Sequence, residues 1–237
     1  MPRNPWFFGR RGSLRDRVVN ALQQARDGDP EAGVEMLAER FPEALAELTA
    51  LGKGDDPAWF RLAAQLAYRA GEMPGALRYA EQALGLEEDG ATWHLLGRVK
   101  IWLRKDDAAA AFRRAAELDR RRFVIPYRVT HKQFMRMAEA ALATVPEAFQ
   151  ARLANTLIVI DDLPDLESVQ HGEDPDLLGV YEGATALEHG LPERIVLYQR
   201  NHENVCANQG QLEREVRETM RHEIGHHFGM AEDDLPY

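Results

Sequence analysis

The sequence has a single cysteine among its 237 residues, Cys206. An internal disulfide is therefore excluded, and one thiol suits a reducing compartment. We interpret Cys206 as an inert thiol rather than as a metal ligand. No apolar run approaches the ~20 residues that span a bilayer, and the first residues lack the continuous apolar segment of a secretory signal peptide. We therefore expect a cytoplasmic protein without a membrane-bound part.

Basic residues are scarce in the second half of the chain. Residues 125–237 carry 9 Lys and Arg against 20 Asp and Glu, a net charge of −11, whereas residues 1–124 carry 20 against 19, a net charge of +1. An acidic surface repels phosphates, so nucleic acid is not the expected substrate of this half. We interpret its acidic surface as a solvated face that aids solubility.

Two histidines with a glutamate between them stand near the C-terminus, in the pattern H-E-x-x-H. His222 and His226 are four residues apart, and on a helix both imidazoles project from one face. That spacing lets two nitrogen atoms occupy two corners of a tetrahedral zinc site. Glu223, one residue further on, cannot join them as a ligand, but it can act as general base towards the attacking water.

The residues that follow this motif supply a third ligand. Gly229 comes three residues after His226, where a helix would stop and the chain could turn back. Glu232 then occupies the third-ligand position of the longer pattern H-E-x-x-H-x-x-G-x-x-H, with a carboxylate in place of the last histidine. Three protein ligands predict one Zn²⁺ per chain.

The remainder of the predicted helix has an apolar face directed away from the two histidines. Leu212, Val216, Met220 and Ile224 cluster roughly 140° from His222 on a helical wheel. This stripe should pack on the core while the two histidines face a cleft. His227 falls within the apolar stripe, so we interpret it as a buried histidine rather than a ligand. The helix is expected to begin at Asn208 or Gly210.

Together with this motif, three earlier segments resemble the zincin-like metallopeptidases of bacteria, also called minimal zincins. The resemblance covers roughly residues 133–235 and implies a compact α/β fold with a small mixed sheet, an active-site helix and a backing helix. It also implies zinc ligation by His222, His226 and a carboxylate of the Glu232–Asp233 pair. The spacing favours Glu232, and Asp233 is the alternative. The matching segments are Asn155–Asp161, Leu178–Ala184, Leu191–Tyr198 and Leu212–Leu235.

The first half of the chain is predicted to be helical and repetitive. Trp59 and Trp93 are 34 residues apart, which is the period of tetratricopeptide repeats. Small and aromatic residues follow both tryptophans at similar places, and Val18–Pro42 resembles a third, degenerate unit. A short array of such repeats offers a surface for a protein partner, and the alternative is a plain helical cap that stabilises the second half.

The sequence of the second half of the chain also predicts three strands and a loop. Leu157–Ile160, Leu177–Tyr181 and Arg194–Gln199 are interpreted as strands, and residues 161–177 as an acidic surface loop over the cleft. The segment Gly179–Glu182 is the candidate edge strand that pairs with an extended substrate, and Tyr181 is a candidate oxyanion donor. His171, His189 and His202 are interpreted as solvent-exposed loop residues.

These observations predict an α + α/β protein. A helical repeat domain at residues 1–120 precedes a zincin-like domain at residues 121–237. The expected function is zinc-dependent hydrolysis of peptide bonds, with the repeats recruiting a partner or substrate. Two alternatives stay open: an adaptor protein whose zinc only stabilises the second domain, and a zinc hydrolase of a non-peptide amide. The number of ligands separates the adaptor from an enzyme, because catalytic zinc sites with three protein ligands leave a coordination position open, whereas structural sites are closed by four protein ligands.

Overall fold

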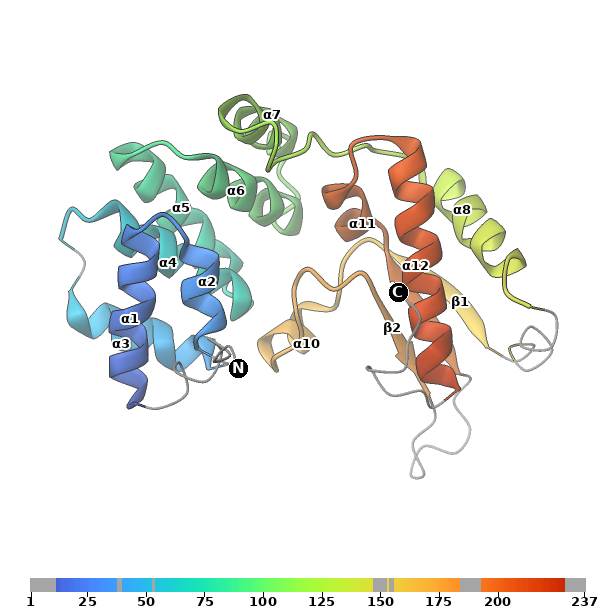
Figure 1. Ribbon diagram of the computed structural model, residues 1–237, viewed down its shortest axis with the longest axis horizontal. Coiled ribbons are helices and arrows are strands. Elements are labelled where there is room, and N and C mark those ends of the chain that lie inside the picture. The colour runs from blue at the N-terminus through green and yellow to red at the C-terminus, as the bar shows by residue number, and fades with distance from the viewer. Residues whose placement is uncertain are drawn as a thin grey trace, which may run out of the picture. The chain divides into compact units, whose positions relative to one another are not determined.

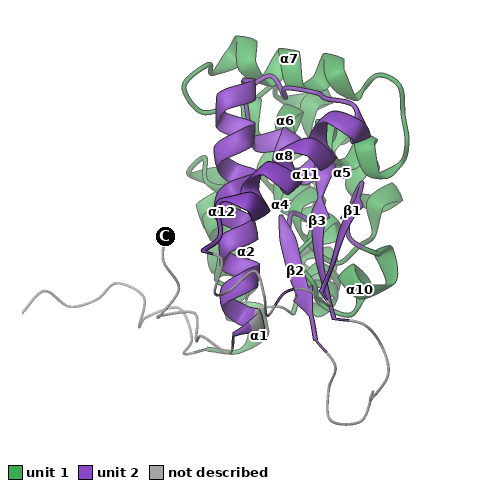
Figure 2. Ribbon diagram, turned by 90° about the vertical axis from the view of Figure 1, so that its right-hand side faces the viewer, with its two compact units in different colours: residues 1–123, 165–175 green, residues 124–164, 176–237 purple. Residues whose placement is uncertain are grey.

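A computed structural model describes residues 12–37, 40–52, 54–146, 153, 156–183 and 193–228. The chain forms two compact units, the first of residues 1–123 with 165–175 and the second of residues 124–164 with 176–237 (Figure 2). The first unit is helical and the second contains a small mixed sheet with helices, so the predicted α + α/β class is confirmed. Among the described residues, no helix is both long and apolar enough to cross a bilayer. The division into domains at residue 120 stays a prediction.

Among the described residues of 14–118, seven helices succeed one another in the first unit (Figure 1). Local sequence sets where several of them begin: Ser13 caps α1 in a capping box with Asp16, and Asp29, Asp56 and Asp89 accept main-chain hydrogen bonds at the starts of α2, α4 and α6. The helices are α1 (Leu14–Arg26), α2 (Pro30–Glu35), α3 (Phe41–Leu51), α4 (Pro57–Arg69), α5 (Met73–Leu86), α6 (Gly90–Trp102) and α7 (Ala108–Leu118).

The helix pairs α4–α5 and α6–α7 occupy the two segments interpreted as tetratricopeptide repeats. A side chain at Gly97 would lie 2.9 Å from the ring of Phe112, so the small residue lets α6 and α7 approach closely. The two tryptophans differ, since Trp59 is buried and donates to a main-chain carbonyl of α3, whereas the half-buried Trp93 donates to Glu88. The helical character agrees with the prediction, and the repeat assignment itself stays a prediction.

The segment expected to be a surface loop, residues 161–177, contains a short helix that belongs to the first unit. This helix, α10 (Leu166–Gln170), is capped by Asp165, and its Val169 is 1% exposed within the core of the helical unit. At Gly71 the backbone has φ +73°, and an added Cβ would lie 2.8 Å from Cγ of Gln170. The loop prediction was wrong for residues 166–170, because a buried valine and a contact with a glycine more than 90 residues away hold this helix, and neither leaves a periodic pattern.

The second unit begins with an extended stretch and continues through helices and strands. Residues 124–130 contain no strand, and the N–H of Tyr127 donates to the carbonyl of Cys206. Thr130 and Gln133 form a capping box at the start of the first helix. The elements are α8 (His131–Ala143), β1 (Leu157–Asp161), β2 (Gly179–Glu182), β3 (Arg194–Tyr198), α11 (Gln199–Val205) and α12 (Gln209–His227).

The three strands form a mixed sheet in the order β1-β3-β2. β1 is parallel to β3 in the register Val159–Val196, and β2 is antiparallel to β3 in the register Val180–Val196. Ile195 and Leu197 of β3 are buried in one core with side chains of α8 and α12. Figure 2 shows α12 next to β2, with β3 and β1 beyond it. The helix α12 thus packs against the sheet, and β2 is the strand nearest to it.

The short helix α11 directly after β3 carries a buried carboxylate at its centre. Glu203 is fully buried and accepts hydrogen bonds from the guanidinium groups of Arg128 at 2.9 Å and Arg200 at 3.0 Å. The N–H of Val129 and the side chain of Gln199 donate to its other oxygen, at 3.0 Å and 2.8 Å. A buried charge is tolerated when it is paired and hydrogen-bonded in this way. Glu203 therefore holds α11 to the extended stretch before α8.

Candidate functional site

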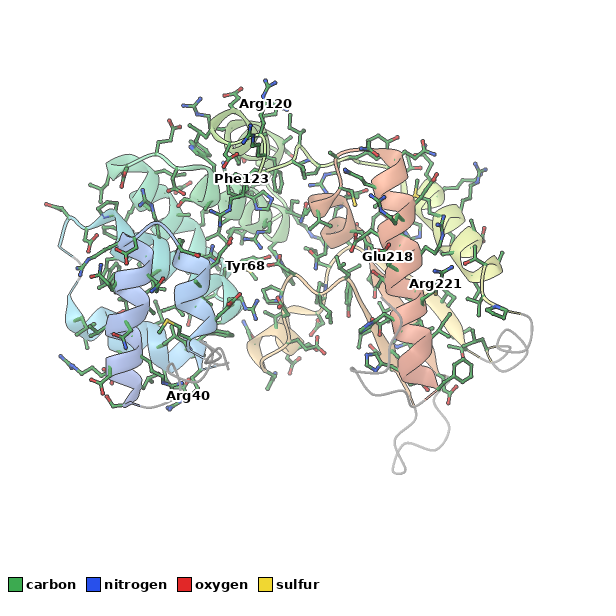
Figure 3. The ribbon with its side chains drawn as sticks, in the orientation of Figure 1. Arg40, Tyr68, Arg120, Phe123, Glu218 and Arg221 are labelled. Carbon is green, nitrogen blue, oxygen red and sulfur yellow. The ribbon has the colours of Figure 1, made fainter. Side chains whose placement is uncertain are left out.

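Three of the predicted site residues, His222, Glu223 and His226, lie on the last two turns of α12, the longest helix described. Asn208 caps this helix through the N–H of Gln211, at one of the two expected starting positions. The predicted apolar stripe is confirmed: its members are no more than 5% exposed and pack with the core of the second unit. Glu218 and Arg221, labelled in Figure 3, stand on the exposed face of the same helix. The stripe consists of Leu212, Val216, Met220 and Ile224.

The two histidines of the motif converge through one nitrogen each. Nε2 of His222 and Nε2 of His226 are 3.0 Å apart, and both side chains are half-buried. Two nitrogens bound to one tetrahedral zinc ion, each 2.0–2.1 Å from it, would be about 3.3 Å apart. The separation of the two nitrogens is therefore close to the one that a shared metal ion requires.

Glu223 lies on the side of α12 between this pair and the core. Its side chain is 6% exposed, and on a helical wheel it stands about 60° from His226 and about 100° from His222. The structure thus brings both imidazoles and the carboxylate to one region of the helix. A carboxylate close to a pair of metal-binding nitrogens, but directed differently, suits proton transfer better than ligation.

The third ligand falls beyond the described part of the chain. Gly229, Glu232 and Asp233 all follow residue 228, and the side chain of His227 is not described either. Within the described residues, no group of three or more His, Cys, Asp and Glu side chains is placed to hold a metal ion. The choice between Glu232 and Asp233 therefore stays a prediction from spacing.

The candidate substrate strand, β2, lies beside the second half of α12. It pairs with β3 on one side and is an edge of the three-stranded sheet that the described residues form. An edge strand exposes main-chain donors and acceptors to which an extended peptide can add. Pairing with a substrate itself stays a prediction.

Tyr181, the candidate oxyanion donor, has a partner in the structure. Its hydroxyl forms a hydrogen bond with Glu193, and partial burial followed by the negative charge of Glu193 raises the pKa of the phenol. To act as an oxyanion donor, the Tyr181 hydroxyl would have to give up its hydrogen bond to Glu193 and donate to the substrate instead.

The structure corrects the interpretation of one histidine. His202 was expected in an exposed loop, but it lies in α11 with no exposed surface. Its Nδ1 is 2.9 Å from the carbonyl oxygen of Tyr198, and its Nε2 is 3.1 Å from Oγ1 of Thr219 on α12. His171 is exposed as expected, and His189 lies outside the described residues. Tyr198 is four residues earlier in the chain, but the second partner, Thr219, is supplied by the tertiary structure, so sequence periodicity could not find His202.

Cys206 lies immediately after α11 and is 1% exposed. Burial, with a smaller contribution from the negative charge of Glu215, raises the pKa of its thiol to about 11. A thiol that stays protonated is a poor nucleophile and a poor metal ligand. The geometry therefore supports the interpretation of Cys206 as an inert core residue.

Comparison with known families agrees with the motif. Residues 153–237 match the family described as zincin-like metallopeptidase. No curated protein matches the chain. The resemblance inferred from the four segments is thus confirmed for the C-terminal part, which contains β1, β2, β3 and α12.

Proposed function

We propose, from the zincin-like character of residues 153–237, that this protein hydrolyses peptide bonds with one bound zinc ion. His222 and His226 would hold the metal together with a carboxylate from Glu232 or Asp233. The observation that carries the proposal is the 3.0 Å approach of the two Nε2 atoms, with the buried Glu223 beside them. When bound, zinc would polarise the scissile carbonyl and lower the pKa of a water towards ~7.

The protein's own groups have separate tasks in this reaction. Glu223 accepts the proton of the attacking water and later delivers it to the leaving amine. Its burial keeps bulk water away from the transferred proton. Electrostatic interactions are stronger in a site from which water is excluded. The edge strand β2 would hold the substrate backbone in extended form next to α12.

The helical unit would recruit a partner or substrate. Its paired helices α4–α5 and α6–α7 support this role, because stacked helix pairs present extended binding surfaces. A cytoplasmic location belongs to the same proposal, since the single cysteine is a buried free thiol.

The test compares the wild type with Glu223→Gln on an unfolded casein-type substrate, with the zinc content of both proteins measured. The amide cannot accept the proton, so we expect full zinc content and a rate lower by about 10² to 10⁴. Glu218→Gln is the matched control, because Glu218 lies exposed on the same helix and should leave the rate unchanged.

Two outcomes would contradict the proposal. A Glu223→Gln protein as active as the wild type would remove the general base from the mechanism. A zinc-loaded wild type that cleaves no protein or peptide would favour the adaptor, or a hydrolase of a non-peptide amide.

A further inference from the structure

His202 is a fully buried titratable side chain that the proposed reaction does not use. The carbonyl oxygen of Tyr198 can only accept, so Nδ1 of His202 must donate to it. The ring is neutral, because burial lowers the pKa of His202 to about 4. Nε2 therefore carries the lone pair, and it accepts a hydrogen bond from the hydroxyl of Thr219.

Thr219 connects this histidine to the helix face that carries the site. It is 8% exposed and lies three residues before His222 and four before Glu223. On a helical wheel Thr219 falls between His222 and Glu223, about 60° from the first and about 40° from the second. A threonine hydroxyl in a helix often bonds to the carbonyl one turn earlier. Here it is directed outward to another helix.

The other branch of the Thr219 side chain contacts β2. Its Cγ2 lies 2.8 Å from the place where a Cβ of Gly179 would be. Gly179 and Tyr181 point to the same face of the sheet, because side chains alternate along a strand. Thr219 is thus the point where α11, α12 and β2 meet, one turn before the residues of the proposed reaction.

His202 is itself fixed from two directions. The carbonyl of Tyr198 holds one nitrogen, and the ring of Phe134 on α8 packs edge-on at a centroid distance of 5.4 Å. The preceding strand β3 lies at the centre of the sheet, so Tyr198 cannot shift without the strand. A hydrogen bond from Thr219 to His202 therefore fixes the position of α12 relative to the sheet, because His202 itself cannot move freely.

We propose that His202 is a positioning residue, which through Thr219 sets the rotation and distance of the site-bearing turns of α12 relative to β2. The inference rests on the proposed function, in which α12 carries the reacting groups and β2 the substrate. A displacement of about 1 Å in such an arrangement can cost 10²-fold in rate. The hydroxyl of Thr219 is the group that transmits the constraint.

The experiment separates the hydroxyl from the methyl group of Thr219. Thr219→Val keeps the shape but removes the hydrogen bond to His202, and we expect kcat to fall about 10- to 100-fold while KM changes by less than about 3-fold. Thr219→Ser keeps the hydroxyl and should retain kcat to within about 3-fold. Ile160→Val in β1, a core residue on the opposite edge of the sheet, is the control for lost stability.

A second readout follows the metal site without catalysis. Visible absorption of the Co²⁺-loaded full-length protein reports the coordination geometry at His222 and His226. We expect Thr219→Val to shift the bands and Thr219→Ser and Ile160→Val to leave them unchanged. All spectra and rates are taken at a temperature where circular dichroism shows each variant to be folded.

The two readouts keep this inference apart from the proposed function. A wild type without peptidase activity would contradict the proposed function, and the cobalt spectra would still decide whether Thr219 sets the site. A Thr219→Val protein whose spectrum and kcat equal those of Ile160→Val would overturn the positioning role. His202→Asn should reproduce Thr219→Val, because asparagine can still donate to Tyr198 but is too short to reach Thr219.

Discussion

The Cγ2 methyl of Thr219 fills the space that a side chain at Gly179 would need, 2.8 Å from its Cβ position. Real Cβ atoms do not come this close to another carbon, so a larger residue at 179 forces the Thr219 side chain or β2 to shift. The carbonyl oxygen of Val196 lies 3.0 Å from the same position. A glycine is therefore needed at position 179 because of the neighbouring atoms, and not because of its backbone conformation.

We predict that Gly179→Ala lowers the free energy of unfolding by about 1–3 kcal/mol through overpacking. Adding Thr219→Ser removes the obstructing methyl, so the double variant should recover part of this loss, with a coupling of at least about 0.5 kcal/mol. Urea unfolding of the four proteins measures the cycle. Gly210→Ala on α12, where the nearest atom is 3.6 Å away, is the matched control and should cause no comparable loss. Strict additivity would mean that Thr219 does not cause the clash.

The long helix of the site could be predicted from sequence because its signals are local. Asn208 marks its start, and a stripe from Leu212 to Ile224 marks its buried face. The capping box of Thr130 and the buried positions Phe134 and Ala138 of α8 obey the same local rules. In both helices, periodic apolar residues and a cap agree over more than three turns.

The short helices could not be predicted in this way. α10 has five residues and α11 has seven, which is too short for a 3.6-residue period to appear. The burial of Glu203 depends on Arg128, 75 residues earlier, and the burial of His202 depends on Thr219, 17 residues later. Polar residues that are buried by distant partners resemble a loop when only the sequence is known.

One zinc ion per chain is the prediction for protein purified without chelators. His222→Ala removes one of the two converging nitrogens, and we expect it to abolish stoichiometric zinc. His227→Ala, which removes the histidine next to His226, is the matched control and should keep the metal. Elemental analysis of both variants checks this. Full zinc content in His222→Ala would mean that the site lies elsewhere.

The third ligand is predicted to be Glu232. It stands at the position that the longer zinc pattern assigns, and Asp233 is the adjacent alternative. Competition for zinc with a chelator measures the affinity of Glu232→Ala and Asp233→Ala. We expect a large loss of affinity in Glu232→Ala only. A loss restricted to Asp233→Ala would reverse the assignment.

Gly71 should tolerate a side chain poorly. Its φ of +73° costs an alanine roughly 1–2 kcal/mol, and an added Cβ would meet Gln170 of α10 at 2.8 Å. Gly71→Ala should destabilise the protein by at least this amount and speed amide exchange in residues 165–175. Gly85→Ala, with open space around it inside α5, should instead gain about 0.5–1 kcal/mol. Unchanged exchange in Gly71→Ala would show that α10 does not depend on this contact.

The stability of the metal-free protein should fall as the pH decreases from 7.5 to 5. Burial is the main reason that the pKa of His202 lies near 4 in the folded state, against an ordinary value of 6.5, and the Tyr198 carbonyl and Glu203 only partly oppose it. Between these values the unfolded chain binds the proton more strongly, so the contribution of His202 is complete above pH 6.5 and is lost as the pH falls towards 4. The loss by pH 5 is about 2 kcal/mol. Urea unfolding across this range, compared with His202→Asn, isolates the histidine, because every other titrating group is common to both proteins. If the two proteins lost stability in parallel, His202 would have to be protonated in the folded state as readily as in the unfolded chain.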